Sequence, residues 1–143
     1  MKRFATALCL ILLLIFIWGN SLLPSEYSSA LSDWLTTTLG GEIVQSGSKA
    51  TSWLNSSNIR TAAHFLEFAV FGFVATKYIS ARIIIKPTIV LSIFLFGILV
   101  AVADEMIQML NDRFSSVEDI WTDVAGFMVG FLISHFFFRP NNP

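Results

Sequence analysis

Charged residues are scarce in this chain of 143 residues, and they make up only 13% of it. Soluble domains contain about 25% charged residues, so the composition argues against a soluble globular protein. Nine Lys and Arg against ten Asp and Glu leave no basic excess, which argues against binding to nucleic acid. The single cysteine, Cys9, excludes an intramolecular disulfide. Since 55% of the residues are hydrophobic, the sequence predicts a small membrane protein.

Four apolar runs approach or exceed the length of about 20 residues that a membrane-spanning helix needs. We read the first run as an uncleaved helix rather than a signal peptide, because no A-x-A-like site follows it. Pro87 suits the first turn of the third helix, and Ser115-Ser116-Val117-Glu118 reads as a capping box before the fourth. The prediction is a single all-α domain over residues 1–143, a polytopic membrane protein with four helices at about 4–23, 61–79, 87–110 and 117–138.

The distribution of lysine and arginine predicts the orientation of these helices. With four spans both termini lie on one side, together with six basic residues: Lys2, Arg3, Lys77, Arg82, Lys86 and Arg139. The opposite side has three: Lys49, Arg60 and Arg113. The positive-inside rule therefore places both termini in the cytoplasm and the long loop of residues 24–58 outside it. All ten acidic residues then fall in the outer half of the membrane or beyond it.

The long loop contains a short pattern with helical spacing, formed by Leu31, Trp34, Leu35 and Leu39. This spacing predicts an amphipathic helix that lies on the membrane surface. A linker without regular structure, anchored at the interface by Trp34 and Trp53, is the alternative.

Polar residues of three helices gather at a similar depth below the outer surface. Charges inside a membrane are costly unless they are paired or hydrated, so they usually face the interior of a bundle. Spacings of three or four residues align them in three groups: Arg60, His64 and Glu67; Asp104 and Gln108, with Glu105 beside them; and Asp119 and Asp123, followed by Gly126 and Gly130. The two glycines form a small-xxx-small motif, which packs helices within one chain or between the chains of an oligomer.

Several of these residues resemble the motifs of the VanZ-like family of bacterial membrane proteins. The resemblance covers about residues 10–135. It rests on Asp104-Glu105-x-x-Gln108, Arg113, Ser116-x-x-Asp119, Gly126, Arg60-x-x-x-His64, and Trp18-Gly19-Asn20-Ser21 with Pro24. It implies a role in the bacterial cell envelope, with the protein in the cytoplasmic membrane. Because the family's namesake is linked to teicoplanin resistance, it also implies a contribution to glycopeptide resistance.

Charge counting leaves several interpretations of the cluster open. Six acidic residues against Arg60 and Arg113 give an excess of four negative charges, so some acids must be protonated or a cation must bind. A purely structural network, with arginine–carboxylate pairs, would only hold the helices together. A divalent ion such as Mg²⁺, Mn²⁺ or Zn²⁺ would suit the imidazole and carboxylates, and the metal candidates are His64, Glu67, Asp104 and Asp119.

Binding of a lipid phosphate is the interpretation that best fits the envelope resemblance. Arginine would hold the phosphate, and the acids and histidine would serve as general acid or base. The catalytic candidates are His64, Glu67, Asp104, Glu105 and Asp119, and the ligand-binding candidates are Ser21, Arg60, Gln108, Arg113 and Asp123. Proton transport is less well supported, because the inner half of the bundle is apolar. No catalytic motif identifies a reaction, so whether the protein is an enzyme stays open.

Overall fold

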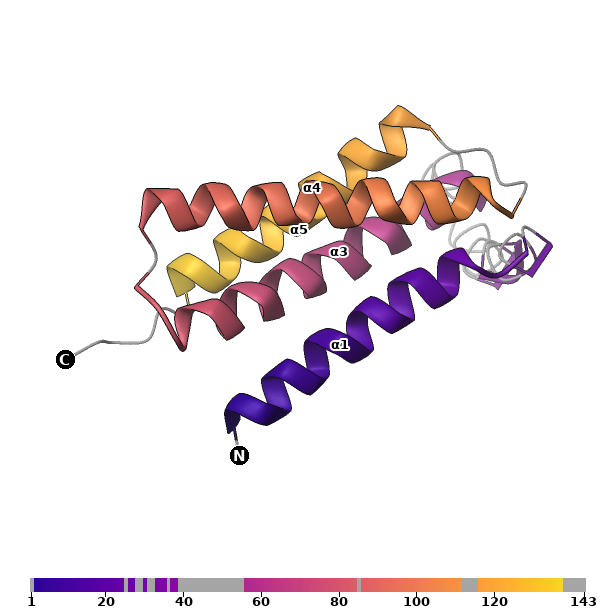
Figure 1. The fold of residues 1–143 in the computed structure, drawn as a ribbon. Coiled ribbons are helices and arrows are strands. Elements are labelled where there is room, and N and C mark those ends of the chain that lie inside the picture. The colour runs from indigo at the N-terminus through magenta and orange to yellow at the C-terminus, as the bar shows by residue number, and fades with distance from the viewer. Residues whose placement is uncertain are drawn as a thin grey trace, which may run out of the picture.

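The computed structural model describes residues 2–24, 26–27, 30, 33–35, 37–38, 56–84, 86–111 and 116–137. These residues form four long helices: α1 (Lys2–Ser21), α3 (Ser56–Ser80), α4 (Pro87–Met109) and α5 (Val117–Phe137). The described part of the chain has no strand, which confirms the all-α prediction. The helices lie side by side as a bundle (Figure 1). α3 begins earlier than predicted, because its first turn is polar and a search for apolar runs does not detect it.

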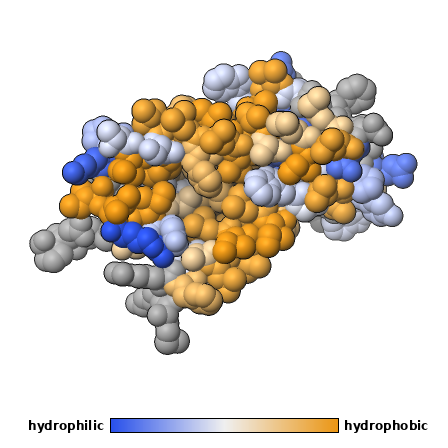
Figure 2. Space-filling model, viewed as in Figure 1, coloured by the Kyte–Doolittle hydropathy of each residue, from blue (hydrophilic) through white to orange (hydrophobic). Residues whose placement is uncertain are grey.

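All four helices are long and apolar enough to cross a membrane. Large apolar side chains such as Leu12, Phe16, Leu99 and Phe136 are exposed on the outside of the bundle. Figure 2 shows the hydrophobic surface over the middle of the molecule and hydrophilic residues toward its ends. An outer surface of this kind is stable only in contact with lipid, so the chain is a multi-pass membrane protein.

α3 and α5 pack backbone against backbone. A Cβ atom on Gly126 would lie 2.3 Å from the carbonyl oxygen of Phe65, and one on Gly72 would lie 2.1 Å from that of Phe127. At Gly130 the carbonyl oxygen of Ala69 would be closer still. Only glycine permits the two backbones to come this close. Small residues at helix interfaces favour helix association in lipid in this way. The Gly126-x-x-x-Gly130 motif is therefore used within the chain.

Aromatic side chains fill the core below the polar residues. Phe68, Phe71 and Phe127 are fully buried, and the rings of Phe71 and Phe127 lie 5.6 Å apart between their centres. Gly97 of α4 makes room for the Phe127 ring, since a Cβ there would come within 2.5 Å of it. This half of the bundle is mainly apolar, as the sequence indicated.

α1 is the most weakly packed of the four helices. Among its described side chains, only Ile17 and Ser21 are buried, and both lie in its last turns. α1 contacts α3 and α4, while α5 packs on α3 and α4 from the other side. The contact of α1 with the bundle therefore depends most on its last turns.

The cap of α5 differs by one residue from the prediction. Ser116 precedes the helix, and its Oγ accepts a hydrogen bond of 3.0 Å from the backbone N–H of Asp119. Ser116 is thus the N-cap, and Glu118 does not occupy the third helical position that a capping box requires. Ser115 lies outside the described residues.

Of the described residues between Pro24 and the start of α3, 26–27, 30, 33–35 and 37–38 are helical. Trp34 is exposed, and Thr37 donates its hydroxyl hydrogen bond to the carbonyl oxygens of Asp33 and Trp34. The helical conformation around Trp34 agrees with the predicted helix, and its place on the membrane surface stays a prediction. Leu31, Leu39 and Trp53 lie outside the described residues.

Substitution of Gly130 tests the close packing of α3 and α5. We expect Gly130→Ala to lower the free energy of unfolding by about 1–3 kcal/mol, because the added methyl group overlaps the backbone of α3. Gly19→Ala is the matched control, since a Cβ there meets nothing within 4 Å. Thermal unfolding in detergent measures both. Equal unfolding temperatures for the two variants would contradict this packing.

Candidate functional site

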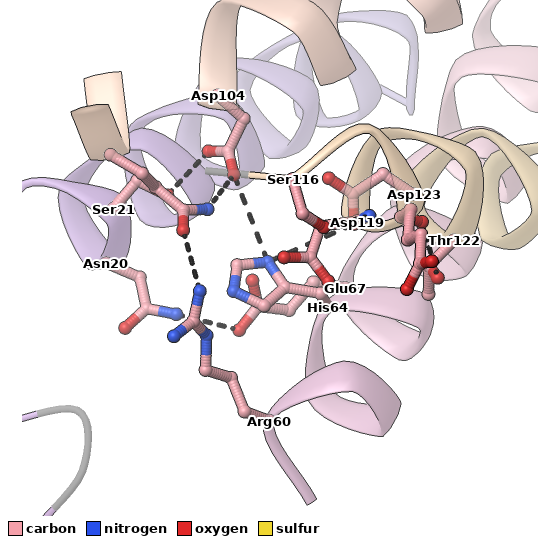
Figure 3. A network of polar contacts seen from close by, with 12 residues as sticks. Asn20, Ser21, Arg60, His64, Glu67, Asp104, Ser116, Asp119, Thr122 and Asp123 are labelled. Carbon is pink, nitrogen blue, oxygen red and sulfur yellow. Dashed lines mark hydrogen bonds and ion pairs between the residues drawn. The ribbon is translucent and has the colours of Figure 1, made fainter. Parts of the chain in front are cut away.

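All four helices contribute side chains to a polar cluster at one end of the bundle. α1 and α4 end there, and α3 and α5 begin there (Figure 1). We call this the polar end. Figure 3 shows its side chains pointing toward one another from the four helices. Sequence spacing predicted a common depth for the residues of three helices, and the structure adds the last residues of α1.

Asp104 of α4 is at the centre of this cluster and is fully buried. The Ser21 hydroxyl donates a hydrogen bond of 2.6 Å to its Oδ1 atom. The side-chain amide of Gln108, one turn further along α4, donates a hydrogen bond of 2.8 Å to its Oδ2 atom. Two donors compensate the desolvated carboxyl group in part, and they fix its orientation.

Arg60 and Asn20 connect further helices to this centre. Arg60 of α3 donates a hydrogen bond of 3.1 Å to the Oε1 atom of Gln108. The arginine therefore reaches Asp104 through an amide, rather than through the direct pairing with Glu67 or Asp104 that a structural network suggested. Asn20 of α1 donates a hydrogen bond of 3.2 Å to the Oε1 atom of Glu67.

His64 lies between two carboxyl groups from different helices. Its Nδ1 atom is 3.9 Å from Oδ2 of Asp104 and 4.0 Å from Oδ1 of Asp123. One donor atom from each of these three buried residues lies within 4.8 Å of the other two. The structure thus groups Asp123 with two of the metal candidates, His64 and Asp104, while Glu67 and Asp119 are not in this group of three.

The remaining candidates occupy different positions. Glu105 is buried beside Asp104, and Glu67 is partly buried. Asp119 is partly exposed in the first turn of α5, so it lies at the margin of the cluster. Arg113 lies outside the described residues.

A pocket of about 260 Å³ opens beside this cluster, between α1, α3 and the helical part of the loop. Its polar lining includes Asn20, Arg60, His64 and Glu67, and its apolar lining includes Phe16 and Tyr27. A second pocket, of about 290 Å³, lies along the same seam between α1 and α3. It is lined by Leu13, Phe16, Ile17, Leu66, Glu67 and Val70. Phe16 and Glu67 line both pockets, so a polar pocket adjoins an apolar one.

Two features of this site were not among the predicted site residues. Asn20 hydrogen-bonds with Glu67, and its sequence signals are its place in the Trp18-Gly19-Asn20-Ser21 motif and its polar side chain at the end of an apolar helix. Phe16 and Tyr27 line the pocket as ordinary hydrophobic residues, and nothing in their local pattern distinguishes them from lipid-facing side chains.

Comparison with known proteins agrees with this architecture. A family model described as VanZ/LLP1 matches residues 6–138, which is nearly the whole chain. No curated protein and no solved structure gives a significant match.

Replacement of Ser21 tests the network around Asp104. We expect Ser21→Ala to lower the free energy of unfolding by about 1–3 kcal/mol, because a buried carboxyl group loses one of its donors. Ser92→Ala is the matched control, since the Ser92 hydroxyl is exposed and bonds only to Thr88 of its own helix. The free energy of unfolding of both variants is measured in detergent. If Ser21→Ala is as stable as Ser92→Ala, the hydrogen bond to Asp104 contributes little to stability.

Proposed function

The chain belongs to the VanZ/LLP1 family, and we propose that it recognises a phosphate-bearing envelope lipid or cell-wall precursor at the outer leaflet of the bacterial cytoplasmic membrane.

The pair of adjoining pockets between α1 and α3 is the observation that carries this proposal. A membrane lipid has a polar headgroup joined to a long apolar chain, and it needs both environments side by side. The polar pocket presents Arg60 and His64, and the apolar pocket presents only hydrophobic side chains apart from Glu67. The shared residues Phe16 and Glu67 would lie where headgroup and chain meet.

Arg60 is the residue best suited to hold a phosphate group. Its guanidinium group is partly buried, lines the polar pocket, and donates a hydrogen bond to the neutral Gln108. Arginine binds phosphate through two parallel charge-assisted hydrogen bonds, and such bonds contribute about 1.5–3 kcal/mol each. A neutral amide neighbour leaves the arginine charge available for an anion, whereas a carboxylate partner would neutralise it.

The orientation in the membrane follows from the distribution of basic residues. Lys77, Arg82 and Lys86 lie at the end of α3 and in the connection to α4, at the opposite end from the polar cluster. By the positive-inside rule this end faces the cytoplasm, together with both termini. The polar end then faces outward, where envelope lipids are accessible.

A non-catalytic role in structure or assembly is the second candidate function. Its support is that the hydrogen bonds from Ser21 and Asn20 join α1 to α4 and α3. In that case the polar cluster stabilises the bundle, and its loss would lower the amount of folded protein. If the protein instead modifies its ligand, His64 and the nearby carboxyl groups are the candidates for general acid and base.

Lipid binding by purified protein tests the proposal directly. We expect an isoprenyl monophosphate to bind the protein in detergent and Arg60→Gln to weaken binding at least about tenfold, because a charge-assisted bond worth more than about 1.4 kcal/mol is lost. Arg82→Gln is the matched control, since Arg82 is exposed and lies at the opposite end. Binding is measured by native mass spectrometry. The proposal fails if both variants bind as the wild type does.

Drug susceptibility separates the envelope role from a structural role. We expect expression in a susceptible Gram-positive host to protect against teicoplanin, and Asp104→Asn to abolish protection at matched membrane levels. Glu118→Gln also removes one negative charge, but from an exposed side chain, and this variant should protect fully. If Asp104→Asn lowers protein level and protection together, the structural role is favoured. If no variant protects, teicoplanin resistance is not a function of this protein.

A further inference from the structure

The polar end contains a group of three side chains that the lipid proposal does not use as a unit, namely His64, Asp104 and Asp123. They come from α3, α4 and α5 respectively, and all three are buried. We propose that these three residues bind a divalent transition-metal ion, Zn²⁺ or Mn²⁺, inside the bundle. This site goes beyond lipid recognition, because it would bind the metal in the absence of a lipid.

Asp123 provides the first argument for an ion. It is 1% exposed, and neither of its carboxylate oxygens has a hydrogen-bond partner among the residues that the structure describes. The Nδ1 atom of His64 lies 4.0 Å from its Oδ1 atom. A buried carboxyl group without a hydrogen bond is strongly unfavourable, and direct coordination of a cation removes that cost.

The geometry and the donor atoms provide the second argument. Zn²⁺ binds nitrogen and oxygen ligands at about 2.1 Å, which keeps the ligand atoms about 3.4 Å apart in a tetrahedral site. The distances of 3.9 and 4.0 Å from His64 to the two carboxylates need only small rotations of side chains to reach that value. One imidazole and two carboxylates suit Zn²⁺ or Mn²⁺. Three protein ligands also leave a coordination position open, as in catalytic zinc sites.

The surrounding hydrogen bonds provide the third argument. Ser21 and Gln108 both donate to Asp104, at 2.6 and 2.8 Å. Carboxylates that bind metals are usually held in this way by neighbouring donors, which fix their orientation. His64 also lines the polar pocket, so a ligand in that pocket would lie next to the proposed ion.

Metal binding by the full chain tests the proposal. Protein in detergent is treated with EDTA and dialysed, and Zn²⁺ and Mn²⁺ binding is then measured by competition with a chromogenic chelator and by elemental analysis. We expect one ion per chain, and we expect Asp123→Asn and His64→Gln each to weaken binding at least about tenfold. Glu118→Gln is the matched control, because it removes the same charge from an exposed residue in the first turn of α5 and lies outside the group of three.

The thermal unfolding temperature distinguishes a lost site from a misfolded protein. Added metal should raise this temperature in the wild type and in Glu118→Gln, but not in Asp123→Asn or His64→Gln. If Asp123→Asn yields no folded protein, His64→Gln decides the test alone. Absence of binding by the wild type, or equal weakening by Glu118→Gln and the ligand variants, would overturn the proposal. Lipid binding is measured separately in EDTA-treated protein, so either proposal can fail without the other.

Discussion

The backbone contact between α3 and α5 is the constraint on which the rest of the structure depends. Gly126 packs on the carbonyl group of Phe65, the residue after His64, and lies one turn from Asp123. The same contact that joins the two helices therefore sets the distance between the imidazole and the carboxyl group. A larger residue at this position would separate the helices and the site together. Packing and chemistry are thus not independent in this bundle.

Above that contact, the polar end concentrates acids in a part of the molecule where they are costly. Asp104, Glu105 and Asp123 are all nearly inaccessible to solvent. The one arginine described at this end hydrogen-bonds with Gln108 instead of a carboxylate. Stabilising the helix packing alone would not require so many acids, since apolar residues of similar volume usually serve as well. The proposed cation would balance part of this negative charge, and Arg60 would serve the proposed phosphate in the adjacent pocket.

The sequence was sufficient to predict the elements but not the partners within the site. The apolar runs indicated the four helices, and the small-xxx-small motif identified the face of α5 that packs closely. Helical spacing aligns residues only along one helix, so it could not show that Asp123, rather than Glu67 or Asp119, joins His64 and Asp104. The role of Asn20 depends on the crossing of α1 and α3, which no local pattern encodes. The first turn of α3 is polar, so a search for apolar runs does not predict it as part of a membrane-spanning helix.

The pairing of α3 with α5 also has a consequence for biogenesis. The two helices are separated in the chain by the whole of α4, and α5 is the last of the four helices to be synthesised. His64 and Asp104 therefore enter the bilayer before α5 has been synthesised. At that stage the chain still lacks Asp123, Gly126 and Gly130. Until α5 is inserted, these polar residues depend on water, lipid headgroups or the insertion machinery. A ribosome that stalls before α5 is translated would leave a chain with three of its four membrane spans and no assembled site.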